Sequence, residues 1–251
     1  MLTLQPNSHP SPLPSKFPER ISKEVIQDLP LLAFEGPIQV LTDSKEARRV
    51  ARRLLREPVL GFDTETRPSF RKGEEYEVAL LQLATRDECF LFRLNHLSLP
   101  DYLQRLLASP HSIKIGVALR DDIRALRRLN EFNPQGFVDL SEVGRQLGIV
   151  TVGLRNLAAI LLKVRISKKA QLSNWERSEL DTAQRTYAAT DAWICVEMLH
   201  YLQQEGFAKD LSALEIGRDV ANEGRRQKAK GKRSDESPAI KSASAPQSLA
   251  S

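Results

Sequence analysis

Residues 61–66 (GFDTET) place two carboxylates one residue apart, directly after the apolar run at 58–60. If this segment is a strand, alternate side chains point to opposite faces, so Asp63 and Glu65 project to the same side. Two like charges on one face of a half-buried strand lower its stability unless a positive charge lies between them. The pair therefore indicates a divalent cation such as Mg²⁺, which prefers oxygen ligands. The alternative is an exposed strand that binds no metal.

Composition limits the class of protein. The 251 residues suit one domain with additional tails, and 41% hydrophobic with 27% charged residues is typical of a soluble globular protein. No apolar run approaches the ~20 residues of a membrane span, and residues 1–20 do not resemble a signal peptide. Only two cysteines occur, Cys89 and Cys195. We therefore expect no disulfide framework, a reducing compartment and a cytoplasmic location.

The formal net charge of +5 is concentrated near the C-terminus. Residues 223–251 contain seven Lys or Arg and three Asp or Glu, which leaves about +1 for the rest of the chain. Any contact of the folded part with nucleic acid must therefore use local patches rather than general basicity. Residues 1–20, rich in Pro and Ser, and the basic and then Ser/Ala/Pro-rich residues 221–251 are predicted to be disordered. Residues 21–220 are predicted to form the folded domain.

Between these tails, strand and helix patterns alternate. Strands are predicted at 38–41, 59–63, 78–84, 89–92 and 113–117, with a short strand or turn at 137–140. Helices are predicted after a cap at Asp43, after Ser98 and Pro100, after Arg120, at 140–147, at 154–162, and from Ser178 to about Gln204 with Asp181 in a capping box. The pattern predicts an α/β fold with a mixed five-stranded sheet, an antiparallel meander plus parallel strands, flanked by helices.

Two further acidic positions follow the first. Asp121 and Asp122 stand where a strand ends and a helix begins, and as neighbours they cannot both face one point, so at most one is functional. Asp is also common in a first helical turn because of the helix dipole alone. In the last helix, Tyr187 and Asp191 are four residues apart and share one face. Taken singly, each is typical of a surface or capping residue.

Together these positions resemble the motifs of a known family. In order and separation, they are similar to the motifs of the DEDDy branch of the DnaQ-like 3′–5′ exonucleases. The matching residues are Asp63-x-Glu65, then Asp122 six residues past Gly116, then the Tyr187-x₃-Asp191 pair of the last helix. This group includes ribonuclease D and the Werner-type exonuclease domain, and the resemblance covers about residues 35–205. It implies a ribonuclease H-like sheet and a metal-dependent enzyme that hydrolyses phosphodiester bonds at nucleic-acid 3′ ends and releases nucleoside 5′-monophosphates.

The resemblance also implies a role for each motif residue. Two ions, Mg²⁺ or Mn²⁺, would be bridged by Asp63. Glu65 and Asp191 would hold the ion on the side of the nucleophile, and Asp122 the ion on the side of the leaving group, partly through water. Tyr187 would orient the attacking water. Four carboxylates neutralise most of the charge of two divalent ions, which explains why the fold would assemble acids that otherwise repel.

Substrate contacts are predicted beside these motifs, for a partner that is DNA or RNA with a free 3′ end, with no membrane involved. Thr64 stands between the two acids, and Arg67 and Phe70 lie in the loop that follows them. Phe70 is available for base stacking worth ~1–3 kcal/mol, although a solvated connector explains the loop equally well. Lys168 and Lys169 belong to a local basic segment suited to phosphate contacts, which would make affinity fall with salt.

Two other readings remain open from the sequence. The first is a catalytically silent, nucleic-acid-binding scaffold of the same fold; the presence of all five motif side chains speaks against it. The second is an α/β enzyme of other phosphate chemistry, which requires that the four carboxylates do not converge in space.

Overall fold

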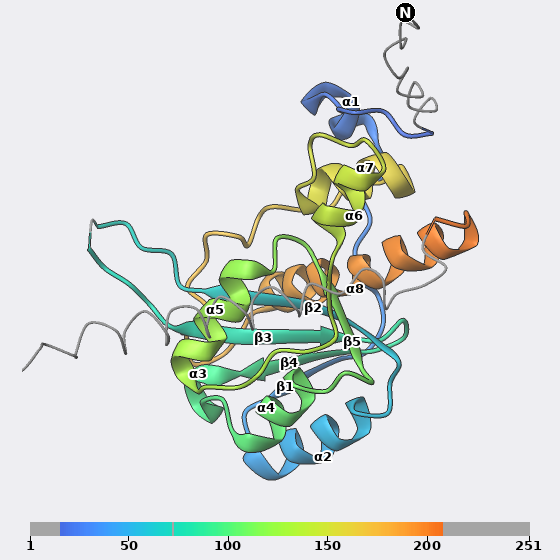
Figure 1. Ribbon diagram of the computed structural model, residues 1–251. Helices are drawn as coiled ribbons and strands as arrows, with labels where there is room; N and C mark the ends of the chain where they lie inside the picture. Colours follow the sequence, from blue (N-terminus) through green and yellow to red (C-terminus); the bar gives the residue numbers. More distant parts are fainter. Residues whose placement is uncertain (1–15, 72, 208–251) are drawn as a thin grey trace, which may run out of the picture. The chain divides into compact units, whose positions relative to one another are not determined.

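The computed structural model describes residues 16–71 and 73–207 (Figure 1). Its centre is a six-stranded mixed sheet of order β1-β4-β3-β2-β5-β6. Strands β2, β3 and β4 are antiparallel neighbours, while β1 runs parallel to β4, and β5 runs parallel to both β2 and β6. The strands are β1 (Ile38–Leu41), β2 (Val59–Thr66), β3 (Val78–Ala84), β4 (Cys89–Arg93), β5 (Ile113–Gly116) and β6 (Phe137–Asp139). The predicted α/β class and mixed sheet are confirmed.

Helices cover both faces of this sheet. Helices α2, α4 and α5 pack on one face, and α8, drawn in orange in Figure 1, packs along β2 and β3 on the other. The helices are α1 (Lys23–Asp28), α2 (Ser44–Leu54), α3 (Leu94–Leu97), α4 (Asp101–Leu107), α5 (Arg120–Leu129), α6 (Leu140–Gln146), α7 (Leu154–Leu162) and α8 (Thr182–Gln204). No helix among the described residues is long and apolar enough to cross a membrane.

Two details of the sequence prediction are wrong. The predicted count of five strands is too low: of the two alternatives for residues 137–140, the strand is the one that forms, because Phe137–Asp139 pairs in parallel with β5 and adds a sixth strand, β6. With three residues, all buried, this segment is too short to show the alternation that marks a strand. The last helix begins at Thr182 rather than Ser178, because the Asp181 carboxylate accepts from the Gln184 backbone N–H at 2.9 Å and completes the capping box at that point.

Alternation along β2 determines which side chains face the site. Leu60 and Phe62 are fully buried in the layer of α2, α4 and α5. Asp63 and Glu65 therefore project to the opposite face, where α8 lies, as the two-residue period of a strand requires. Strand β2 lies between β3 and β5, and β5 pairs with its first three residues, Val59 to Gly61. Asp63 and Glu65 follow this paired stretch, where β2 is hydrogen-bonded to β3.

Gly61 lets α8 approach β2 closely. A Cβ at this position would lie 2.0 Å from the Ala192 carbonyl oxygen, so a side chain has no room there. Ala192 directly follows Asp191 in α8. The contact between Gly61 and α8 therefore determines how near the third acid comes to the two on β2.

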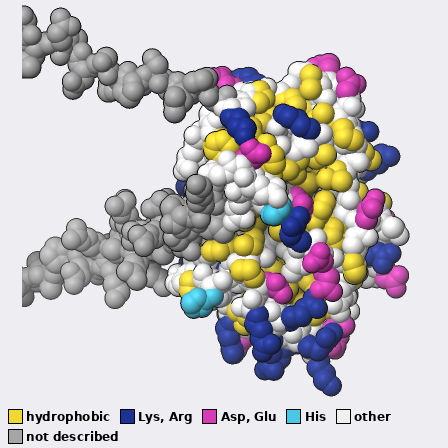
Figure 2. All heavy atoms as spheres, turned by 90° about the vertical axis from the view of Figure 1, so that its right-hand side faces the viewer, with side chains coloured by type: hydrophobic (Ala, Val, Ile, Leu, Met, Phe, Trp, Pro, Cys, Tyr) yellow, Lys and Arg dark blue, Asp and Glu magenta, His cyan; other side chains and the backbone are white. Residues whose placement is uncertain are grey.

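The outer surface of α2 is strongly basic. Lys45 and five arginines surround a shallow groove there, and Figure 2 shows Lys and Arg side chains gathered at the end of the molecule where Figure 1 draws α2. The arginines of this α2 basic surface are Arg48, Arg49, Arg52, Arg53 and Arg56. Since α2 covers the face opposite to α8, this surface does not belong to the acidic site.

The two predicted tails fall mostly outside the described residues. The predicted disorder of residues 1–15 and 221–251 concerns segments that the structure does not describe. Residues 16–20 are described, and in this stretch Phe17 is buried, with its ring 5.3 Å from the ring of Phe207 and 6.5 Å from that of Tyr201.

Candidate active site

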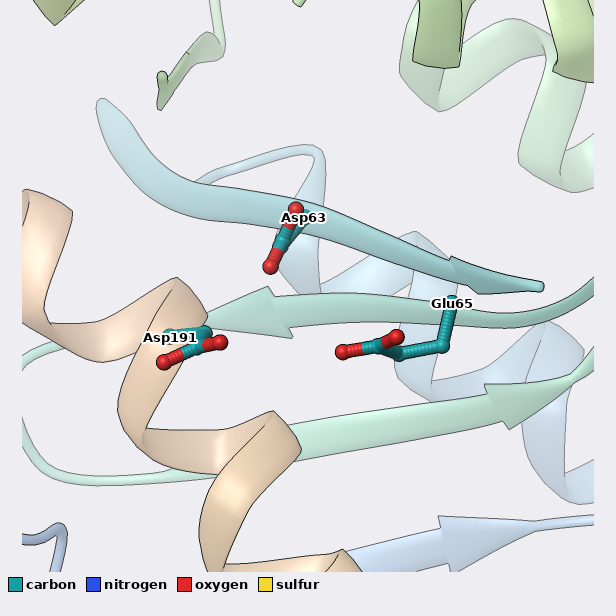
Figure 3. A group of neighbouring side chains, drawn as sticks. All are labelled: Asp63, Glu65 and Asp191. Carbon is teal, nitrogen blue, oxygen red and sulfur yellow. The ribbon is translucent and has the colours of Figure 1, made fainter. Parts of the chain in front are cut away.

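Three of the predicted acids converge between β2 and α8. One carboxylate oxygen from each of Asp63, Glu65 and Asp191 lies within 4.8 Å of the other two. In Figure 3 the first two side chains leave β2 and the third comes from α8, with the carboxylate of Glu65 directed toward Asp191. The alternative of an α/β enzyme of other phosphate chemistry, which requires that the carboxylates do not converge, does not apply to these three residues.

Burial makes this cluster unfavourable without a cation. Glu65 is 9% exposed and Asp191 is 5% exposed, while Asp63 is partly buried. Burial, followed by the charges of Asp191 and Asp122, raises the pKa of Asp63 well above its usual value. Burial and then the charge of Asp63 raise the pKa of Glu65 to about 10, and burial raises the pKa of Asp191 to about 7. The site stores electrostatic repulsion that a bound cation would relieve.

The donor set suits a hard divalent cation. The Oδ1 atom of Asp191 is buried and accepts no hydrogen bond from any described residue. Such an unpaired buried oxygen costs free energy unless a ligand satisfies it. Three carboxylates within 4.8 Å of one another, with no nitrogen or sulfur ligand in the group, match the preference of Mg²⁺ for oxygen.

Tyr187 lies one turn before Asp191 on the same face of α8. Its ring centroid is 6.0 Å from that of Trp175, which is fully buried. Burial first, and then the charges of Asp191 and Glu65, raise the pKa of the Tyr187 phenol above its usual value. The hydroxyl therefore keeps its proton at neutral pH and is available as a hydrogen-bond donor beside the acids.

Asp122, the fourth predicted acid, lies beside the cluster and not within it. It is held by Thr64, whose hydroxyl donates to the Asp122 carboxylate. Burial raises the pKa of Asp122 to about 6, and the hydrogen bond from Thr64 acts in the opposite direction. Asp121, by contrast, points to solvent and pairs with Arg124 at 2.7 Å. Of the two adjacent acids, only Asp122 is directed toward β2.

The turn that leads to Asp122 is fixed by Asp139 of β6. The Asp139 carboxylate accepts from the backbone N–H groups of Ala118 at 2.9 Å, Leu119 at 3.0 Å and Ser141 at 2.8 Å. Ala118 has a φ of 60°, in the left-handed region that costs energy for a residue with a side chain. The buried carboxylate thus holds a strained turn directly before α5 and also caps the start of α6.

A cavity of about 750 Å³ opens in front of the acids. Of the five predicted substrate contacts, Thr64 and Lys168 line it. Arg67 and Phe70 line a neighbouring hollow instead, where Arg67 pairs with Glu176 at 3.2 Å and Phe70 is 80% exposed. Lys169 is exposed and belongs to neither set of lining residues.

Two basic residues that line the cavity were not among the site residues predicted from the sequence. Arg155, in the first turn of α7, lines the cavity, and its charge lowers the pKa of Asp191 against the effect of burial. Lys23 of α1 lines the same cavity. Arg155 could have been noticed as the one charged residue of a mostly apolar helix, whereas nothing near Lys23 in the sequence links it to the acids.

Without bound metal, we expect the free energy of unfolding to fall as pH rises from about 5 to about 7. In the folded state Glu65 and Asp191 hold their protons up to pKa values of about 10 and about 7, whereas their unfolded values are near 4.5 and 3.8. The folded state therefore binds more protons in this window, and each such group lowers stability by ~1.4 kcal/mol per pH unit. Urea unfolding in EDTA at several pH values measures the slope.

The Asp191→Asn variant is the control for this slope. It removes one titrating group, so its unfolding free energy should depend less steeply on pH. Adding Mn²⁺ to the parent chain should stabilise it more near pH 7 than near pH 5, because protons compete with the cation for the carboxylates. A metal-free stability that is constant or increases across this window would contradict the expectation.

Comparisons with known proteins identify the family. Residues 38–206 match the model of a 3′-5′ exonuclease family, DNA_pol_A_exo1. The chain is 30% identical over 184 residues to the mouse bifunctional 3′-5′ exonuclease/ATP-dependent helicase WRN, covering 69% of this chain and 13% of that protein. It is also 30% identical over 174 residues to ribonuclease D of Haemophilus influenzae, covering 66% of this chain and 42% of that protein.

A solved structure agrees on the fold. The crystal structure of the Nibbler EXO domain of Aedes aegypti has a TM-score of 0.65 at 22% identity, covering 73% of this chain and 99% of that domain. The fold, the acidic site and the family match define a nuclease class: this chain belongs to the 3′-5′ exonuclease family. It spans less than half the length of either curated relative, so their full activities do not transfer with the family.

Proposed function

We propose that this chain is a metal-dependent 3′–5′ exonuclease that hydrolyses phosphodiester bonds at nucleic-acid 3′ ends and releases nucleoside 5′-monophosphates. The observation that carries the proposal is the convergence of Asp63, Glu65 and Asp191 at one cavity, with the Tyr187 phenol beside them. A family match alone does not decide whether a chain has activity. Buried carboxylates that repel one another are retained at a cost in stability, and a catalytic centre gives them a purpose.

Four carboxylates would hold the cation cofactor, which we propose to be two Mg²⁺ or Mn²⁺ ions. Asp63, Glu65 and Asp191 would form one set of ligands, and Asp122 would complete the second together with Asp63. When bound, such ions lower the pKa of the attacking water and stabilise negative charge on the phosphate and the leaving oxygen. The motif assignment to the DEDDy branch rests on these residues and on Tyr187.

The remaining contributions come from the chain itself. Tyr187 keeps its proton and would donate its hydroxyl to orient the attacking water, a positioning role that needs no strong base. The Thr64 hydroxyl would hold the Asp122 carboxylate in place. Lys168, which lines the cavity, would bind a phosphate group of the substrate strand. The names of relatives include a ribonuclease D, and for this chain we propose either RNA or DNA strands with a free 3′ end as substrates.

The test is a product ladder. Matched 5′-labelled RNA and DNA single strands are incubated with the full chain in Mg²⁺, in Mn²⁺ and in EDTA. We expect shortening one nucleotide at a time from the 3′ end with metal, none in EDTA, and nucleoside 5′-monophosphates as products. Strands that stay intact in both metals while still binding would instead support a catalytically silent scaffold. Internal cleavage would contradict the exonuclease assignment.

A further inference from the structure

Helix α1 forms one wall of the substrate cavity, although it lies before the family-matched segment. The family match begins at residue 38, whereas α1 spans Lys23–Asp28. Lys23, Ile26 and Gln27 of this helix line the same cavity as Asp63, Glu65 and Asp191. Part of the substrate cavity is therefore built by a segment that the family comparison does not include.

The wall is anchored to the loop that carries Lys168. Backbone hydrogen bonds join Leu32 N–H to the Arg165 carbonyl at 2.8 Å and Arg165 N–H to the Pro30 carbonyl at 2.9 Å. The Arg165 Nε also donates to the Leu29 carbonyl at 2.9 Å. Ile26 is buried, and Ser22 caps the start of α1. These contacts fix α1 relative to residues 163–170 without involving the exposed side chain of Lys23.

Acids and cations line the cavity from different elements. The acids come from β2 and α8, while the cations come from three separate elements: Lys23 on α1, Arg155 on α7 and Lys168 on the following loop. Neither Lys23 nor Lys168 forms an ion pair with any residue that the structure describes. Unpaired cations near a site of phosphodiester chemistry are suited to bind the phosphates next to the reacting one.

We propose that α1 is a substrate-binding wall and that Lys23 binds a backbone phosphate of the single strand held in the cavity. This rests on the proposed function, since it adds a substrate contact to that site. The cavity volume of about 750 Å³ lies within the ~300–1,000 Å³ range of sites that enclose small ligands, so it suits the last few unpaired nucleotides of a strand. We expect Lys23 to contribute to affinity and not to the chemical step, because it is on α1 and not on β2 or α8, which carry the carboxylate cluster.

The test compares two lysine-to-glutamate changes. Lys23→Glu and Lys45→Glu alter charge equally, but Lys45 belongs to the α2 basic surface on the opposite sheet layer. Both are made in an Asp63→Asn background so that binding is measured without turnover, by fluorescence anisotropy of labelled 12-nucleotide RNA and DNA strands in Mg²⁺. We expect Lys23→Glu to raise Kd by about 5- to 20-fold and to reduce the salt slope by about one, and Lys45→Glu to stay within about twofold.

The outcomes separate this inference from the proposed function. The role of α1 would be overturned if the Lys23→Glu variant bound like its parent or if the two charge changes gave equal Kd values. It would also be overturned if the parent bound neither the RNA nor the DNA strand. If Lys23→Glu raises Kd but the chain with Asp63 intact releases no nucleotides, the role of α1 as a substrate-binding wall is upheld and the proposed exonuclease activity is refuted. Lys23→Gln, which keeps an exposed polar side chain, should show a smaller loss and unchanged thermal unfolding, which excludes misfolding as the cause.

Discussion

Asp63→Asn is expected to lower kcat/KM of the exonuclease by on the order of 10³-fold or more while leaving the fold intact. Asp63 has an oxygen within 4.8 Å of oxygens of both Glu65 and Asp191, and its pKa also responds to the charge of Asp122. Asp63 therefore interacts with all three of the other acids, as Glu65 also does, and an amide there removes both a ligand and a negative charge. Steady-state hydrolysis of a labelled strand in Mg²⁺ and in Mn²⁺ measures the loss.

The same substitution should increase stability in the absence of metal. Replacing Asp63 by an amide of nearly equal size relieves the repulsion that contributes to the raised pKa of Glu65. Urea unfolding in EDTA should therefore give Asp63→Asn a free energy of unfolding at least equal to that of the parent chain. An inactive protein that is also less stable would point to misfolding instead of a lost ligand.

Asp121→Asn provides the matched control. The chemical change is identical, but the Asp121 side chain is 87% exposed and pairs with Arg124. We expect kcat/KM within about twofold of the parent, since an exposed ion pair of this kind contributes little. Equal losses in the two variants would show that the assay responds to net charge and not to the site.

Gly61→Ala should lower the free energy of unfolding more than the addition of one methyl group at any other position in the sheet. The new Cβ would meet the Ala192 carbonyl oxygen at 2.0 Å and the carbonyl carbon at 2.8 Å, and backbone atoms cannot move aside as the end of a side chain can. Overpacking commonly costs ~1–3 kcal/mol, and we expect about 3 kcal/mol or more here because two backbones collide. Urea unfolding measures the loss, and reduced hydrolysis by any folded fraction would follow from displacement of Asp191.

Gly153→Ala is the control for this prediction. Gly153 caps α7 with a φ of −70°, and the nearest atom to its added Cβ would be the Asn156 Nδ2 at 3.8 Å, an ordinary contact. The cost should stay below about 1 kcal/mol, the usual range for losing a favourable cap residue. A Gly61→Ala chain as stable as Gly153→Ala would show that α8 does not pack on β2 as closely as described.

The elements with strong local signals were predictable from the sequence. The five predicted strands are present because each is a short, mostly apolar segment bounded by turn residues. Asp43 caps α2 as predicted, with its carboxylate accepting from the Glu46 N–H at 2.8 Å. The convergence of Asp63 with Asp191 was expected only from the resemblance to a family, because 128 positions of chain separate them. No local pattern specifies that contact.

What the sequence could not provide depends on tertiary packing. Lys23 and Arg155 reach the cavity because α1 and α7 pack near it, and a lysine on a six-residue helix has no distinctive spacing. Phe70 and Arg67 follow the first motif directly, yet the loop carries them to a neighbouring hollow. Strand β6 is too short for its pattern to distinguish a strand from a turn, and the strand forms because β5 offers it a partner. Proximity in sequence was thus a poor guide to substrate contacts.

The position of β2 between β3 and β5 restricts how this site can vary. A shift of its pairing by one residue would turn Asp63 and Glu65 into the apolar layer of α2, α4 and α5, and would bring Phe62 out beside α8. Insertion or deletion of a single residue within β2 would therefore remove the acids and the core at the same time. Changes of length that preserve the protein must fall in the loops on either side of this strand.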